Sequence, residues 1–374
     1  MNAHAPAASA SQKAIARRLW FDLHSWVGLK LSVFMSFVLL TGTLAVLAHE
    51  IDWLLNPEIR VQPGAQRANW GAMVDAVRRD YPAWTFESIE RPEAARFAAQ
   101  ASMRTPQGRL RFVWVDPYRG VTTGDTGWFN AHRLLRNTHR HLMMPTRIGV
   151  PIVAALSIPL LISLLSSLYI YRHWWRGFFS LPRPERPRRF WGDLHRLLGV
   201  WSLAFIALIG LTGLWYLIES LGGAAPVVKA PTAAHARNIA ADGAAVDRAI
   251  AQARDRWPGF VVEGVVPGGK DGTLLLTGQA DAAMVRPRAN AIAFDAVSGR
   301  WLGARDARAL SVHQRISEMA DPLHFGDFAG FWLKLAWFVF GAMLTALSLS
   351  GVYLYGLRIA DSWRSAQRKR ERSA

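Results

Sequence analysis

The chain has 374 residues and no cysteine, and its formal net charge is +17. The lack of cysteine excludes disulfides, thiolate-held iron–sulfur clusters and covalent haem attachment, so a metal centre must use histidine, carboxylate or a cofactor with its own ligands. The positive charge is concentrated in three segments: the N-terminus, residues 172–190 and residues 358–374. This distribution is typical of membrane topology, and we expect no nucleic-acid partner.

Apolar residues gather in four blocks near 27–48, 149–171, 197–218 and 328–356. Each block has about the 20 residues that a helix needs to cross a lipid bilayer. The long loops between the blocks are nearly balanced in charge. By the positive-inside rule, both termini and the 172–190 loop lie in the cytoplasm and the long loops lie outside. We therefore expect a multi-pass membrane protein, with the long loops in the periplasm if the cell is Gram-negative.

The predicted order begins with a cytoplasmic N-terminus (1–18), a transmembrane helix (19–48) and an external domain (49–146). A second helix (147–171), a basic cytoplasmic loop (172–190), a third helix (191–219), a second external domain (220–326), a fourth helix (327–357) and a basic cytoplasmic tail (358–374) follow. Within the external domains, the patterns predict helices over 70–80 and 244–257 and strands over 84–89, 110–115, 261–266, 273–277 and 291–295.

The sequence contains an internal repeat. The pattern W-x-D-L-H-x-x-x-G occurs at residues 20–28 and again at 191–199. Each long loop also has a D-x-x-x-G turn after a predicted strand, and the helix that follows ends near Tyr169 or Tyr353. Both copies cross the membrane in the same direction. The predicted fold is an α-helical integral membrane protein, a four-transmembrane-helix bundle made of two parallel repeats, with two small α+β extracytoplasmic domains.

Two histidines occupy the same position in the two repeats. His24 and His195 are each followed one helical turn later by a glycine, Gly28 or Gly199. Positions i and i+4 share a helix face, so the missing side chain leaves room for a flat ring beside the imidazole. We predict that both histidines bind one b-type haem as axial ligands and that both glycines contact it. The alternative is interfacial histidines, with glycines that allow close helix packing.

A second histidine precedes the second helix of each repeat. His141 and His324 lie at matching distances from the repeated tyrosines, to within one residue. We predict that they bind a second haem b, with His139 as the alternate to His141. The remaining histidines near membrane borders are the alternate iron ligands His49 and His173 and the candidate substrate contacts His132 and His313.

These features resemble those of PepSY-associated transmembrane proteins. The resemblance rests on the repeated DLHxxxG helix start, the D-x-x-x-G turns and the histidine before each second helix, and it covers roughly residues 13–360. The family includes inner-membrane ferric-siderophore reductases of the ferrioxamine reductase type. The resemblance implies two b haems, PepSY-like periplasmic domains, and His24, His195, His141 and His324 in the positions of the family's histidines.

The function implied by the resemblance is a di-haem reductase that passes electrons across the membrane to a ferric siderophore. The cytoplasmic segments are too short for a flavin domain and contain no G-x-G-x-x-G motif after a strand, so the donor is expected to be a quinol or a separate cytoplasmic reductase. Two alternatives stay open: a membrane-anchored binding or regulatory protein without redox activity, and a transporter for iron or a siderophore.

Overall fold

The computed structural model describes residues 7–30, 32–233, 239–269 and 271–373. These residues divide into two compact units. The first, which we call the helical unit, contains the chain up to Leu47, Leu135–Ala224 and the chain from Leu323 onward. The second, the sheet unit, contains Ala48–Leu134 and Ala225–Pro322. Each unit therefore draws its residues from both repeats.

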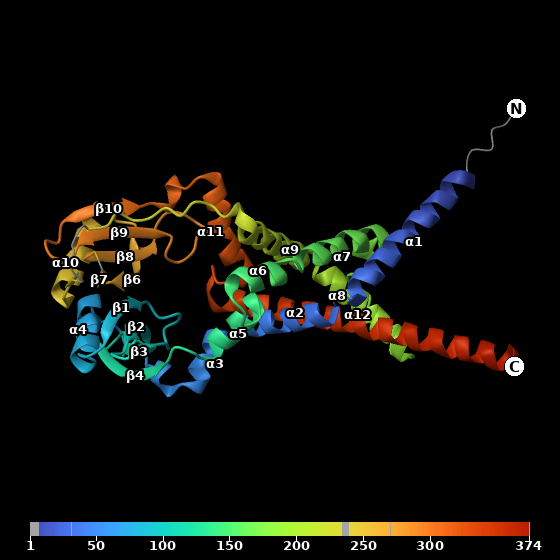
Figure 1. The fold of residues 1–374 in the computed structure, drawn as a ribbon, viewed down its shortest axis with the longest axis horizontal. Coiled ribbons are helices and arrows are strands. Elements are labelled where there is room, and N and C mark those ends of the chain that lie inside the picture. The colour runs from blue at the N-terminus through green and yellow to red at the C-terminus, as the bar shows by residue number, and fades with distance from the viewer. Residues whose placement is uncertain (1–6, 31, 234–238, 270, 374) are drawn as a thin grey trace, which may run out of the picture. The chain divides into compact units, whose positions relative to one another are not determined.

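The helical unit is built mainly from helices (Figure 1). They are α1 (Ala7–Lys30), α2 (Ser32–Val46), α6 (Thr146–Ala154), α7 (Ser157–Ile170), α8 (Pro187–Trp201), α9 (Leu203–Ile218) and α12 (Gly330–Ser373), with short turns η2 (Trp174–Gly177) and η3 (Glu219–Gly223). Helices α5 (Ala131–His141) and α11 (Val312–Phe325) begin in the sheet unit and end in the helical unit. Within the helical unit, α2 packs along α12 and α7 packs along α1 and α9.

In the described part of the chain, three helices are long and apolar enough to cross a membrane: Thr146–Ile170, Leu203–Gly223 and Gly330–Arg368. A fourth crossing would require α2 and α3 (Ala48–Leu55), which are bent by 61° at their break, to count as one span. The helix before it, α1, carries Arg17, Arg18 and Asp22 and is not uniformly apolar.

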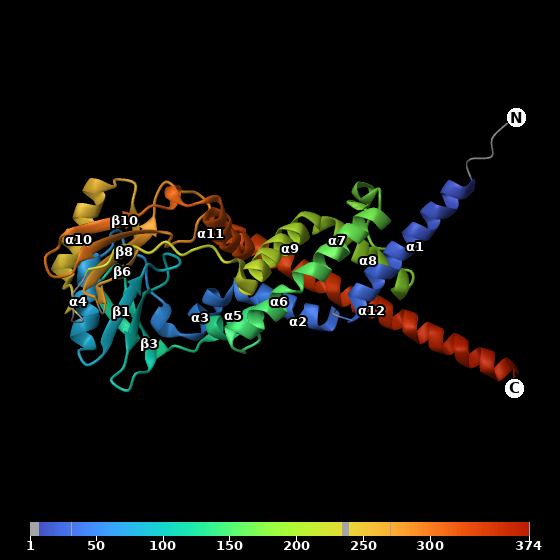
Figure 2. The same cartoon turned by 45° about the horizontal axis from the view of Figure 1, so that its top comes forward.

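The sheet unit contains one eight-stranded antiparallel sheet, in the order β10-β9-β8-β6-β1-β2-β3-β4. The strands are β1 (Thr85–Glu90), β2 (Ala99–Arg104), β3 (Leu110–Asp116), β4 (Val121–Gly127), β6 (Val261–Val266), β8 (Thr273–Gln279), β9 (Asn290–Asp295) and β10 (Trp301–Arg305). Strands β5 (Ile239–Ala240) and β7 (Gly268–Gly269) form a small second sheet. The other elements are α4 (Trp70–Asp80), α10 (Gly243–Arg256), η1 (Pro57–Ile59) and η4 (Ala307–Ala309). Figure 2 shows α4 and α10 close together beside the strands, and they are in contact.

The predicted four-helix bundle with two small external domains is wrong. Strand β1 of the first loop pairs with β6 of the second, with Ile89 opposite Val265, so both loops build a single sheet. One apolar core extends from Val113 in the first half to Phe294 in the second. An isolated four-stranded sheet would leave the backbone of β1 or β6 unpaired at an edge, and the pairing removes both edges. The sequence pattern of each loop contains no information about this pairing.

The two halves of the sheet unit keep the local signs of duplication. Asp116 Oδ1 accepts hydrogen bonds from the backbone N–H groups two and three residues further along the chain, and Gly120 adopts a φ of +66°. Asp295 does the same after β9, with Gly299 at a φ of +68°. The left-handed backbone explains the glycine in both D-x-x-x-G turns. The predicted helices and five predicted strands are present within a few residues, whereas β2, β4 and β10 were not predicted.

Candidate functional site

The structure brings His24 of α1 and His195 of α8 together, and we call them the first pair. Their ring centroids are 6.5 Å apart and their planes make an angle of 81°. Two imidazoles that bind one metal ion from opposite sides, with metal–nitrogen distances of about 2.0–2.1 Å, place their ring centres roughly 6 Å apart. The spacing of the first pair therefore suits a shared metal ion.

Each histidine of the first pair contacts a buried serine through Nδ1. His24 Nδ1 lies 3.0 Å from Ser166 Oγ on α7, and His195 Nδ1 lies 2.9 Å from Ser350 Oγ on α12. Metal-bound histidines usually engage their second ring nitrogen in this way, because the contact fixes the orientation of the ring. With Nδ1 engaged, Nε2 is the nitrogen suited to bind iron.

A second pair is formed by His139, near the end of α5, and His324, near the end of α11. Their ring centroids are 6.2 Å apart and the planes are inclined by 37°. His139 Nδ1 lies 2.9 Å from the Val38 carbonyl oxygen in α2, and His324 Nδ1 lies 2.8 Å from Thr212 Oγ1 in α9. This pair has the same spacing and the same engagement of Nδ1 as the first pair.

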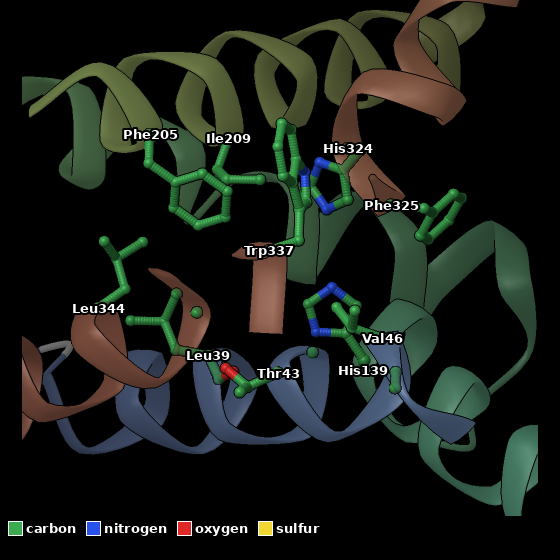
Figure 3. Close-up of a pocket in the computed structure, with 13 residues that line it drawn as sticks. Leu39, Thr43, Val46, His139, Phe205, Ile209, His324, Phe325, Trp337 and Leu344 are labelled. Carbon is green, nitrogen blue, oxygen red and sulfur yellow. The ribbon is translucent and has the colours of Figure 1, made fainter. Parts of the chain in front are cut away.

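A small open cavity of about 60 Å³ lies beside the second pair. In Figure 3, His139 and His324 reach into it from opposite sides, with Trp337 beside His324. The rest of the lining is almost entirely apolar: Leu39, Gly42, Thr43, Ala45, Val46, Phe205, Ile209, Phe325, Gly341 and Leu344. An apolar slot with two facing imidazoles is the environment that a porphyrin with two axial histidines requires.

Gly42 of α2 makes room for the His139 ring. A Cβ atom at this position would lie 2.5 Å from His139 Cε1, closer than real Cβ contacts allow. The predicted glycine contacts occupy other places. A Cβ at Gly199 would meet Leu347 Cδ1 at 3.8 Å, which is ordinary contact. Gly28 belongs to α1, but its surroundings lie outside the described residues.

The structure pairs His324 with His139, the alternate, and places His141 elsewhere. His141 is the last residue of α5, and Leu142 and Met143, at φ 55° and 59°, turn the chain away from the helix axis. Its Nδ1 is buried without a hydrogen-bond partner among the described residues. The sequence could not separate the two histidines, because both match the spacing of His324 to within one residue. Their role as iron ligands stays a prediction.

Another pair of histidines lies in the sheet unit. The rings of His49 in α3 and His132 in α5 are 4.1 Å apart, and His49 Nε2 lies 3.5 Å from Glu93 Oε1. Asp52 accepts hydrogen bonds from the backbone N–H groups of Ala131 and His132 and so caps the start of α5. Of the other candidates, His173 packs against Trp175, and His313 is exposed at the start of α11.

An ion-pair cluster lies close to the first pair. Its carboxylate belongs to Asp193, two residues before His195. Arg183 Nε donates to Asp193 Oδ2 at 2.8 Å, and Arg196 also pairs with this carboxylate. The Arg183 hydrogen bond is the main reason that the pKa of Asp193 is held well below its usual range. Asp193 belongs to the repeated D-L-H motif, and this ion pair anchors the preceding basic loop to α8.

In the described part of the chain, no group of three or more histidine, aspartate or glutamate residues is arranged to hold a metal ion. Among these described residues, we therefore find no site at which three such side chains bind a single metal ion. A haem needs only two axial ligands, because the porphyrin supplies four of its own. The paired histidines, the engaged Nδ1 atoms and the space kept by Gly42 fit two-histidine haem ligation.

Sequence reasoning missed Ser166 and Ser350. Each lies three residues before the repeated tyrosine, in the matching segments S-S-L-Y-I-Y and S-G-V-Y-L-Y. The recurrence of a serine at the same position in both repeats could have identified these residues from the sequence. Thr212 belongs to the repeated Thr-Gly pair at 41–42 and 212–213, but its contact with His324 depends on the tertiary fold.

The apolar helices, the duplicated halves and the paired histidines define a membrane protein built by internal duplication. The chain belongs to the family described as the PepSY-associated TM region, which matches residues 21–358. It is similar to "Uncharacterized protein PA4219" of Pseudomonas aeruginosa, with 26% identity over 258 residues. The matched segment covers 61% of this chain and 64% of that protein, so it spans less than two thirds of that relative.

Proposed function

We propose that the chain is a di-haem b reductase of the bacterial inner membrane that delivers electrons to ferric siderophores in the periplasm. The observation that carries the proposal is the pair of facing imidazole couples, 6.5 Å and 6.2 Å between ring centroids. A binding protein or a simple anchor has no need of two such couples. Membership of the PepSY-associated family supports the membrane location.

The residues of the helical unit have distinct roles in this proposal. His24 with His195, and His139 with His324, would each hold one haem through Nε2. Bound haem iron supplies one-electron transfer between its ferric and ferrous states. The protein orients the four rings through their Nδ1 contacts, and apolar side chains line the cavity beside the second pair.

The charge distribution supports the direction of electron flow. The basic loop before α8 and the basic end of α12 indicate the cytoplasmic side, where the electron donor would be a quinol or a separate reductase. The substrate would be reduced on the side of the sheet unit. One electron converts ferric to ferrous iron, which binds less strongly to the hard oxygen ligands of a siderophore, so the metal is released.

The test begins with protein purified in detergent from haem-replete cells. We expect the absorption spectrum of b-type haem, with a pyridine haemochrome assay giving two haems per chain. After reduction with dithionite and removal of the excess, ferrioxamine should reoxidise the protein, and a ferrous chelator should report one Fe²⁺ for each electron lost. Colourless protein would contradict the haem assignment. A haem protein that ferrioxamine leaves reduced would contradict the substrate assignment.

A further inference from the structure

The serines that contact the first pair are related by the duplication. Ser166 holds His24 within the first repeat, and Ser350 holds His195 within the second. Both serines are almost completely buried, at 0% and 2% exposure. The same histidine–serine contact thus occurs once in each repeat. The histidine comes from the repeated D-L-H motif, and the serine lies on the last long helix of the same repeat.

The direction of each hydrogen bond follows from the second contact of each hydroxyl. A serine has a single hydroxyl proton. Ser166 Oγ donates it to the Ser163 carbonyl at 3.1 Å, and Ser350 Oγ donates it to the Leu347 carbonyl at 2.7 Å. Because each hydroxyl has a carbonyl to receive its proton, its oxygen is available to accept from the imidazole, and this geometry favours a proton on Nδ1 of His24 and His195.

The second pair leads to the same protonation through different groups. Thr212 Oγ1 donates to the Leu208 carbonyl at 2.8 Å, so it accepts from His324 Nδ1. The partner of His139 is the Val38 carbonyl, which can only accept. At all four imidazoles, the contacts therefore favour a proton on Nδ1.

We propose that Ser166 and Ser350 are positioning residues that fix the tautomer of His24 and His195 and raise the basicity of Nε2 toward iron. This inference rests on the proposed haem function. Without the hydroxyl, only a backbone carbonyl, that of Ser163 for His24 and of Leu347 for His195, still accepts from the ring. The proton is then held less firmly on Nδ1, and the tautomer with its proton on Nε2, which cannot bind a metal, becomes more populated. Loss of such a partner contact typically weakens metal binding about 10- to 100-fold.

A neighbouring residue provides a matched control. Ser167 also donates its hydroxyl proton to the backbone, to the Leu164 carbonyl at 2.7 Å. It lies roughly 100° around the helix from Ser166, so it faces different neighbours. Replacement of Ser167 by alanine removes the same atoms from the same helix as replacement of Ser166.

The experiment compares Ser166→Ala, Ser350→Ala, the double variant and Ser167→Ala in the full-length protein. Transfer of haem to apomyoglobin is measured first, because it reports release from each site without any activity assay. We expect half of the haem in the double variant to leave about 10-fold faster or more, while the other half behaves as in wild type. The haem that stays serves as an internal control for folding. Threonine at either position should restore retention, as Thr212 shows that its hydroxyl serves the same role.

The second readout is the reduction potential of each haem by spectroelectrochemistry. A less basic ligand stabilises ferric iron less, so the potential of the first-pair haem should rise in the serine variants and stay unchanged in Ser167→Ala. If the serine variants match Ser167→Ala in both release rate and potential, the serine assignment is overturned while the haem function stands. Colourless wild-type protein overturns both. Equal loss of both haems in every alanine variant, with no rescue by threonine, also overturns the specific role.

Discussion

In the first histidine pair, equivalent residues of the two repeats face each other, and each is held by the equivalent serine. In the second pair, the partners of Nδ1 differ, because His139 contacts a backbone carbonyl in α2 and His324 contacts a threonine hydroxyl in α9. At the first pair, the two repeats share the same partner residue type for Nδ1. At the second pair, they share only the ring spacing and the use of Nδ1. A carbonyl contact also depends on close approach, and Gly42 permits it.

The strongest test of the comparison removes one ligand from each pair. We expect His195→Ala to lose the first-pair haem and keep the other, so that the pyridine haemochrome ratio falls from two haems per chain to one. His324→Ala should give the same ratio with the complementary spectrum. Independent sites predict additive losses in the double variant. A single variant that loses both haems and remains folded by circular dichroism would show that the pairs are not independent.

The next test asks which residue of α5 completes the second pair. His139→Ala should lose the second haem because its ring faces His324 at 6.2 Å. His141→Ala should keep it, since the structure directs His141 elsewhere. Haem content and the Soret maximum measure the difference. The reverse result, with His141 essential and His139 dispensable, would restore the original sequence prediction.

A smaller effect is expected from filling the space beside His139. Gly42→Ala places a methyl group 2.5 Å from His139 Cε1, and overpacking of this kind costs about 1–3 kcal/mol. We expect roughly 5- to 150-fold weaker haem binding at the second pair, with the first pair unaffected. Gly192→Ala is the matched control, because a Cβ on that helical glycine meets nothing within 4 Å. Haem titration of the apoprotein compares the two variants.

The smallest expected effect concerns the hydroxyl at the second pair. Thr212→Val preserves the shape of the side chain but removes the acceptor for His324 Nδ1. Loss of one such hydrogen bond costs about 1 kcal/mol, a roughly fivefold faster release of the second haem. Thr212→Ser provides the control, because it keeps the hydroxyl that contacts His324 Nδ1 and should release haem as the wild type does. Equal release rates in the two variants would argue against a role for Thr212 at this site.

The extent of sequence prediction differs between the two units. In the sheet unit, alternating apolar residues indicated α4, α10 and five strands. They could not indicate that β1 and β6 pair, because strand pairing between distant loops leaves no local pattern. In the helical unit, the four apolar blocks located the candidate spans. The bend of 61° between α2 and α3 was not visible in composition, and among the described residues three helices are each long and apolar enough to cross a membrane.

The sequence by itself determined the duplication, the apolar helices and the histidines at their ends, since these depend on local periodicity and on identities repeated at fixed spacing. Only the tertiary structure decided that His139, and not His141, faces His324. The difference of two residues rotates a helical side chain by roughly 200°, so the choice depends on how α5 packs beside α2. The same holds for the serine, threonine and carbonyl partners, because they lie on other helices and meet the histidines only after the chain has folded.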